Sequence, residues 1–278
     1  MKIVVIVIVL AVVAICPSCI LYNVMRYPYD GTSMPIFSIS PGNYAQEGSV
    51  VLTISCKTAD AKIRYTLDGT EPDATNGIPY DGGLIKISSD TFLKAVAYVG
   101  DKVSYLNRGH YVFTPPADYR IGEPGPAGGI IAYDKDGYSD GWRYLEVAPI
   151  ELRRTGLKWG RMVVTGNRSG METGYTETMA ILNKSGPDAE AALYCWDLSY
   201  GGYSDWFLPS EYEMDIFAPN LMDSDDYIGK AYWSSSESSS DYDWACAIMI
   251  FSTGSSSKIY VDKNVRSPTT YTLPVRRF

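Results

Sequence analysis

Catalytic chemistry would have to rest on very few residues of this chain. The sequence holds one histidine, His110, with no nucleophile pattern around it, whereas nucleophilic catalysis needs a base beside the nucleophile. Asp68 and Glu71 could in principle act as an acid and a base. However, Asp68 and Gly69 form a turn signal and Pro72 stops further strand pairing, so we expect structural roles for both carboxylates. We predict that the protein is not an enzyme.

One segment has the spacing of a metal loop. Asp134, Asp136 and Asp140 place oxygen ligands around Gly137, an arrangement that suits Ca²⁺. The EF-hand pattern needs another ligand and a distant glutamate, and both are missing. We therefore prefer a solvated turn, with Ca²⁺ as the alternative, and expect no other cofactor. No Cys-x-x-Cys pair follows Cys19, so a zinc site of the usual spacing is not expected.

The first residues predict export. Lys2 precedes an apolar run from Ile3 to Ile15, which is shorter than the roughly 20 residues of a membrane-spanning helix. Ser18 before Cys19 suits lipidation at Cys19, whereas bulky Ile15 does not suit it at Cys16. We predict a lipoprotein signal at 1–19, a linker at 20–34, an acyl anchor in membrane lipid, and a place in the cell envelope, on the outer surface or facing the periplasm. An uncleaved anchor and plain secretion remain alternatives.

Three cysteines remain beyond this segment, and the odd number matters in an exported chain. Cys195 and Cys246 fall in one predicted domain and could pair, while Cys56 lies apart. Buried free thiols are the interpretation we favour, because free cysteine is among the most buried residue types. The net charge of −8 over 278 residues, with no basic cluster, argues against nucleic-acid partners.

Alternation of apolar and polar residues predicts strands at 50–57, 63–67, 84–87, 92–99 and 111–113, so the first domain should be a β-sandwich. Within it, the block Ile63–Pro72, followed by Tyr80 and Leu93–Ala97, resembles the chitobiase/β-hexosaminidase C-terminal-domain family over about residues 35–114. That resemblance implies an immunoglobulin-like sandwich that is not the catalytic part of those hydrolases. Tyr65 and Leu67 are expected to point inward.

Prolines 115 and 116 predict a linker at 115–120 and a second domain at 121–278. Helices are expected at 176–183, at 188–198 and after Pro209, where Ser210 and Glu213 form a capping box. Strands should run from Ile130 to Asp134, through Asp243–Phe251 in a central position, at 258–261, and at Tyr271–Arg276. The fold class is thus mostly β, with an α+β C-terminal domain.

Three blocks near the C-terminus carry a second resemblance: Gly202–Ser210, Tyr232–Glu237 and Leu273–Phe278. Together with the opening Ile121–Gly129, they resemble the C-terminal domain of a bacterial collagen-like adhesin, the Lcl C-terminal-domain family, over roughly Tyr119 to Phe278. The resemblance implies a C-type-lectin-like fold in which first and last strands pair. One departure is Leu273, where the family usually has arginine. Its structural motif would comprise Trp206, Pro209, Ser210, Glu213, Trp233, Glu237 and Arg276.

A polar, aromatic stretch beside these blocks is the candidate ligand surface, because hydroxyls and aromatic platforms suit sugar or protein surfaces. Its tripeptides lack the pattern of calcium-dependent sugar-binding lectins. We predict a non-catalytic bacterial cell-surface lipoprotein that binds glycans or host or matrix polymers, as an adhesin does. Alternatives are an envelope structural protein, a retroelement-diversified protein receptor, or an oxidase on the same fold. The candidate ligand residues are Ser238, Ser239, Asp241, Tyr242, Asp243, Trp244, Ser255, Ser256 and Tyr260.

Overall fold

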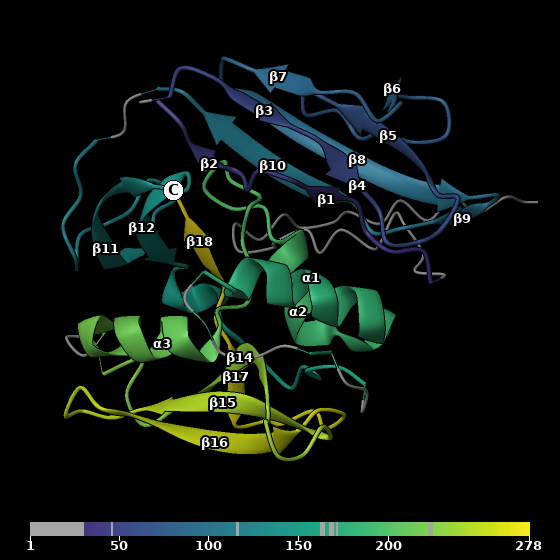
Figure 1. The fold of residues 1–278 in the computed structure, drawn as a ribbon. Helices are drawn as coiled ribbons and strands as arrows, with labels where there is room; N and C mark the ends of the chain where they lie inside the picture. Colours follow the sequence, from purple (N-terminus) through teal and green to yellow (C-terminus); the bar gives the residue numbers. More distant parts are fainter. Residues whose placement is uncertain are drawn as a thin grey trace, which may run out of the picture.

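The computed structural model describes residues 31–278 apart from 46, 115–116, 162–164, 167–169, 171 and 222–224. The predicted signal with Cys19, nearly all of the 20–34 linker, and the two linker prolines lie outside the described residues. The described chain is mostly β-structure arranged in several sheets, as predicted (Figure 1). No helix in this part combines the length and the apolar character needed to cross a membrane.

Two layers of strands build the N-terminal domain (Figure 1). The larger layer runs in the order β2 (Gly42–Asn43), β10 (Asn107–Val112), β8 (Thr91–Val99), β5 (Lys62–Thr66) and β6 (Ile78–Pro79), with β9 (Lys102–Val103) beside β8. The other layer holds the pairs β1 (Ile36–Phe37) with β4 (Ile54–Ser55) and β3 (Val50–Leu52) with β7 (Ile85–Ile87). Alternate strand residues meet between the layers in an apolar core that includes Leu52, Ile87 and Leu93.

Two details of this domain differ from the sequence prediction. The expected strand at 50–57 is divided at Thr53, whose backbone pairs with Ser38, so that β3 and β4 have different partners. Leu67 is 36% exposed and does not point inward. The reason is that β5 ends at Thr66, whose hydroxyl donates to the carbonyl of Thr70 and turns the chain.

The C-terminal domain combines two sheets with three helices. The smaller sheet has the order β11 (Ile130–Ser139), β12 (Trp142–Val147), β18 (Val275–Arg277). The larger has the order β13 (Arg154–Thr155), β17 (Thr270–Thr272), β14 (Ala231–Glu237), β15 (Trp244–Ile250), β16 (Ser256–Asp262). The helices are α1 (Gly174–Ser185), α2 (Glu190–Asp197) and α3 (Glu211–Phe217), with 3-10 turns η1 (Ile150–Leu152), η2 (Gly186–Asp188) and η3 (Ala218–Leu221).

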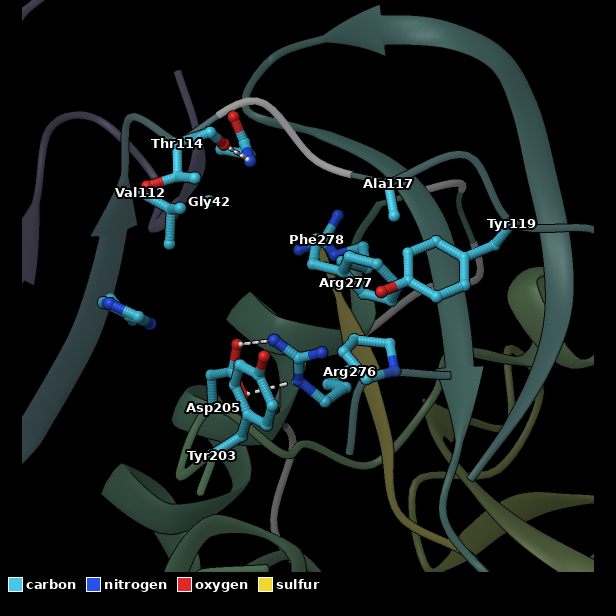
Figure 2. Close-up of a pocket in the computed structure, with 13 residues that line it drawn as sticks. Gly42, Val112, Thr114, Ala117, Tyr119, Tyr203, Asp205, Arg276, Arg277 and Phe278 are labelled. Atoms are coloured by element: carbon cyan, nitrogen blue, oxygen red, sulfur yellow. Dashed lines mark hydrogen bonds and ion pairs between the residues drawn. The ribbon is translucent and has the colours of Figure 1, made fainter. Parts of the chain in front are cut away.

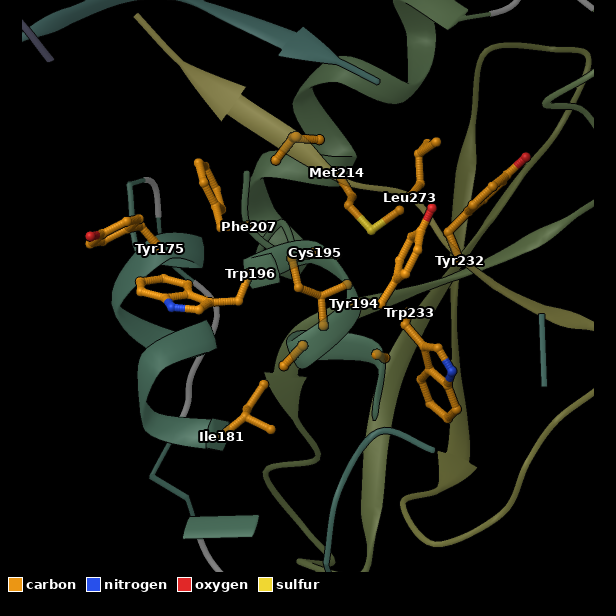
Figure 3. Close-up of a cluster of buried hydrophobic side chains, with 14 of the residues drawn as sticks. Tyr175, Ile181, Tyr194, Cys195, Trp196, Phe207, Met214, Tyr232, Trp233 and Leu273 are labelled. Carbon is orange, nitrogen blue, oxygen red and sulfur yellow. The ribbon is translucent and has the colours of Figure 1, made fainter. Parts of the chain in front are cut away.

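Local signals account for the helices. The capping box at the start of α3 is confirmed: Ser210 accepts from the backbone of Glu213, and Glu213 accepts from that of Ser210. In α2 the apolar residues are buried, Trp196 among them, and they join the core shown in Figure 3. The central position of β15, between β14 and β16, is also confirmed.

Three strand predictions in this domain are wrong in detail. β11 does not stop at Asp134 but continues to Ser139, and a register shift accommodates the extra residues. The expected last strand is broken at Pro274, which cannot donate a ladder hydrogen bond, so β17 and β18 belong to different sheets. β18 pairs with β12 and not with β11. The domain's ends nevertheless meet, because the rings of Tyr119 and Phe278 lie 5.5 Å apart.

The two domains are packed together through α1 and α2, which lie between the sandwich and the five-stranded sheet (Figure 1). Trp196 donates its indole N–H to the carbonyl of Leu106 at 2.9 Å, and Arg108 pairs with Asp197 at 3.0 Å. Met34 and Tyr105 of the N-terminal side belong to the C-terminal hydrophobic cluster. The contact is therefore a continuous packed interface that fixes the orientation of the domains.

Candidate functional site

The structure divides the sequence-predicted ligand residues between two ends of the β15–β16 hairpin. Ser255 and Ser256 lie at its turn, whereas residues 238–243 form the loop that enters β15 at the other end. The seven residues of β15 separate these ends by about 20 Å. One small ligand cannot contact both groups.

Ser238 is a correction to the predicted ligand surface. It is only 3% exposed, and its hydroxyl accepts from the backbone N–H groups of Ser240 and Asp241. Its role is to shape the loop, because a side chain that is buried and bonded in this way has no face left for a ligand. Ser239 and Asp241 beside it are exposed.

Three large aromatic side chains gather at this loop end. Tyr242, Trp244 and Tyr260 are 48%, 40% and 47% exposed. Trp244 pairs with Asp262 and Tyr260 with Cys246 across β15 and β16, so Trp244 and Tyr260 are diagonal neighbours on one face, within reach of each other. Tyr242 precedes Trp244 by two residues. We call Tyr242, Trp244 and Tyr260 the aromatic patch.

The surroundings of the aromatic patch are acidic. Asp241 and Asp243 flank it in the loop, and Asp262 lies beside Trp244 on the neighbouring strand. Lys258, two residues from Tyr260, is drawn toward α3, where it pairs with Glu211 and lies 4.0 Å from Asp215. The patch therefore presents rings and carboxylates, while Lys258 is engaged by Glu211 and the buried Lys263 by Glu237.

In contrast to the exposed aromatic patch, the tryptophans of the C-terminal sequence blocks are buried. Trp206 and Trp233 are fully buried, and Trp233 donates its indole N–H to the carbonyl of Leu157 at 3.1 Å. The carbonyl of Pro209 accepts from the backbone of Ser235 at 2.7 Å, which ties the start of α3 to β14. Of the six tryptophans in the chain, all described, five are at most 3% exposed and Trp244 is the exception.

Arg276 joins two carboxylates from distant parts of the chain. Its Nε and Nη2 donate to Asp205 at 2.9 and 3.0 Å, and its Nη1 donates to Glu146 at 3.2 Å (Figure 2 shows the Asp205 pair). Its side chain is 2% exposed. Asp205 thus anchors the last strand through Arg276, and sequence reasoning did not single it out for this role. Glu146 was not singled out from the sequence, although β12 and β18 place it directly opposite Arg276.

The glycine-rich opening of the domain serves this cluster. The backbone N–H groups of Ala127 and Gly129 donate to the Glu146 carboxylate at 3.1 and 2.8 Å. A Cβ on Gly125 would lie 2.4 Å from Cδ of Glu146, so only glycine allows the loop to approach this closely. Burial raises the pKa of Glu146, against the opposing effects of Arg276 and these N–H groups.

A second buried ion pair stabilises the end of β14. Glu237 accepts from Lys263 at 2.6 Å and from the backbone N–H groups of Thr165 and Gly166. Both members of the pair are almost fully buried. Burial alone would raise the pKa of Glu237, but the hydrogen bond from Lys263 and the Thr165 contacts lower it below the usual range. Glu237 thus holds the loop before α1 against β14.

Glu177 is a buried carboxyl on the inner side of α1. Its Oε2 accepts from the hydroxyls of Ser235 and Ser236 at 2.6 and 3.2 Å, and it is 6% exposed. Burial raises the pKa of Glu177 to about 7, more strongly than these hydrogen bonds lower it. The side chain is therefore protonated in the folded state below this pH, because burial favours the neutral form of a carboxyl.

The residues considered from the sequence for catalysis and metal binding do not form a common site, and each contacts different neighbours. His110 on β10 stacks on Phe92 with ring centroids 3.8 Å apart, while Asp68 binds the backbone and hydroxyl of Thr70. Asp134 is engaged by Arg143 at 2.8 and 3.0 Å. Among the described residues, no group of three or more potential ligands could hold a metal ion.

All three described cysteines are free. Cys195 and Cys246 are fully buried, and no disulfide joins them in the described part of the chain. Burial raises the pKa of the Cys246 thiol, with Glu211 adding to the effect. A thiol in this setting stays protonated and is a poor nucleophile.

The comparison with known families covers part of the N-terminal domain. Residues 39–105 match the family described as Chitobiase/beta-hexosaminidase C-terminal domain. The first resemblance seen in the sequence is thereby supported, with somewhat narrower bounds. No curated protein matches the chain. The match includes β3 to β9 and ends before β10, which carries His110.

Proposed function

We propose that this protein is an exported, lipid-anchored binding protein of the bacterial cell envelope that holds a neutral glycan polymer on its aromatic patch. The observation that carries the proposal is the exposure of Trp244 and Tyr260 at one end of the β15–β16 hairpin and of Tyr242 in the loop that enters it. Aromatic rings bind the apolar faces of sugar rings, while neighbouring carboxylates and hydroxyls accept and donate hydrogen bonds.

The charge of the surface narrows the ligand class. Asp241, Asp243 and Asp262 surround the patch, and the chain as a whole carries −8. A sulfated or uronic polymer would meet like charge at close range, which costs free energy. Acidic host or matrix polymers are therefore less favoured as ligands than neutral glycans.

We further propose that residues 119–278 have a C-type-lectin-like fold. Support comes from the arrangement of the quoted blocks: Arg276 bonds to both Asp205 and Glu146, the glycine-rich opening donates to Glu146, and the ends of the domain meet. In this account the blocks supply the scaffold and the loop before β15 supplies the ligand surface. Fold alone does not set the ligand, which must be argued from the patch.

A glycan array with the full-length protein tests the proposal. Wild type should bind neutral polymers such as β-glucan or chitin fragments, and a Tyr242→Ala, Trp244→Ala, Tyr260→Ala variant should lose that binding. Tyr212→Ala is the matched control, because Tyr212 on α3 is also 48% exposed but lies outside the patch. Preference for heparin-like polymers, or equal binding by the triple variant, would contradict the proposal. Binding only to proteins would favour the receptor alternative, and no binding at all would favour a structural envelope role.

A further inference from the structure

A cavity of about 180 Å³ lies at the junction of the two domains, away from the aromatic patch. Its walls come from distant segments: β10 and the residues around β2 in the N-terminal domain, the segment before β11, and the last residues of β18 (Figure 2). Because the domains are packed together through α1 and α2, the cavity is a fixed feature of their arrangement.

Aromatic rings line this cavity. Tyr119, Tyr203 and Phe278 line it, and the Arg276 guanidinium stacks on Tyr203 at 3.8 Å, which holds that ring in place. Figure 2 shows Tyr119, Tyr203 and Asp205 around the open space. Neither tyrosine hydroxyl forms a hydrogen bond with any other described residue, so both are available to a ligand.

The cavity lining also includes the imidazole of His110. Nδ1 of His110 is buried and forms no hydrogen bond within the described chain, although the ring is fixed by stacking on Phe92. Burial lowers the pKa of His110, against the effects of Asp205 and Asp90. The ring is therefore neutral at pH 7 and offers one donor and one acceptor.

The charged side chains at the cavity comprise two carboxylates and two guanidinium groups, so their charges balance. Asp205 and Glu146 are matched by Arg276, which bonds to both, and by Arg277, whose side chain also lines the cavity. A ligand with a full charge would gain little from these groups. The cavity instead combines flat apolar surface with hydroxyl, imidazole and carboxylate groups, which is the combination that recognises a neutral polyhydroxylated ring.

We propose that the interdomain cavity binds one neutral sugar ring, through stacking on Tyr203 and hydrogen bonds to the Tyr203 hydroxyl and His110. This site goes beyond the proposed function, because it lies on a different part of the molecule and does not depend on the aromatic patch.

His110 provides the test, because it is the single histidine and gives one set of imidazole NMR signals. The full chain without added histidines is titrated with methyl pyranosides and, separately, with glucuronate. A neutral pyranoside should shift the His110 signals in a saturable way. Tyr203→Phe keeps the ring and removes one hydroxyl, so it should weaken this binding by about 3–10-fold. Tyr212→Ala, on α3 and outside both the patch and the cavity lining, should leave it unchanged.

Three results would overturn the proposal. They are an unperturbed His110 across the neutral panel in the folded protein, a stronger response to glucuronate than to neutral sugars, and an affinity unchanged in Tyr203→Phe. In a background that lacks the aromatic patch (Tyr242→Ala, Trp244→Ala, Tyr260→Ala), sugar binding detected by saturation transfer should be lost on adding His110→Phe, which retains a ring to stack on Phe92; binding at full strength there would also place the site elsewhere. Loss of binding at the aromatic patch alone would not affect these outcomes.

Discussion

Two regions of the molecule, the junction around Arg276 and the aromatic patch, contain the same kinds of side chain. These side chains are buried at the junction and exposed at the patch. At the junction, aromatic rings and carboxylates are buried, and each charge has a partner: Arg276 bonds to Asp205 and Glu146. At the patch, Trp244 and two tyrosines are 40% to 48% exposed, and Asp241 and Asp243 beside them are exposed as well. The aromatic and charged residues of the three C-terminal sequence blocks are thus buried or partly buried and stabilise the fold. The exposed rings of the aromatic patch are the ones that can contact a ligand.

Removal of Arg276 should have the largest effect in the molecule. In Arg276→Leu, the carboxylates of Asp205 and Glu146 would stay buried without a cation, which costs about 3–5 kcal/mol of unfolding free energy. Chemical denaturation measures this value. Arg266→Leu is the control, because Arg266 pairs with Glu190 at the surface, where such pairs contribute at most about 1 kcal/mol. If both variants lost the same free energy of unfolding, burial of the ion pairs at the junction would not make them more important for stability than a surface pair.

The two kinds of tryptophan should separate stability from binding. Trp233→Ala should destabilise the fold by about 3–5 kcal/mol, because it empties a fully buried site in the C-terminal core. Trp244→Ala should change stability by no more than about 0.5 kcal/mol. Thermal melting of both variants checks the contrast. A Trp244→Ala variant as unstable as Trp233→Ala would mean that the patch is part of the core.

Glu177 should make stability depend on pH. Its folded-state pKa of about 7 lies above the ordinary value of 4.5, so between these values the folded state holds a proton that the unfolded state has lost. Stability should therefore fall by about 3 kcal/mol as pH rises from 4.5 to above 7. In Glu177→Gln this loss should disappear, and the variant should be more stable than wild type at pH 8. Denaturant titrations at pH 5 and pH 8 test this, with exposed Glu151→Gln as the control for net charge.

Short-range features could be predicted from the sequence, and long-range ones could not. The capping box of α3 involves residues three apart, and its chemistry alone identified it. Glu146 and Arg276 are 130 residues apart in the sequence, and they meet because β18 pairs with β12. This pairing is possible because Pro274 ends β17 and lets the chain enter the other sheet as β18. The prediction that Leu67 points inward was wrong because the hydrogen bond from the Thr66 hydroxyl to the Thr70 carbonyl ends the strand one residue early. Alternation of residue types does not reveal such a bond.

The ligand surface was predicted in part. Composition identified the loop before β15, but it also included Ser238, which is buried, and the turn at Ser255, which lies at the other end of the hairpin. Exposure of the aromatic residues depends on which face of β15 and β16 each one occupies. That follows from strand register, which alternation within a single strand does not determine.

Acrylamide quenching of tryptophan fluorescence tests the central claim most directly. Trp244 is 40% exposed while the other five tryptophans are at most 3% exposed, so quenching at low acrylamide concentrations reports on Trp244. Saturation with a neutral glycan oligomer should protect this fraction, and Trp244→Phe should remove the quenchable signal. If the glycan binds and Trp244 remains as quenchable as in the free protein, the aromatic patch is not the binding surface.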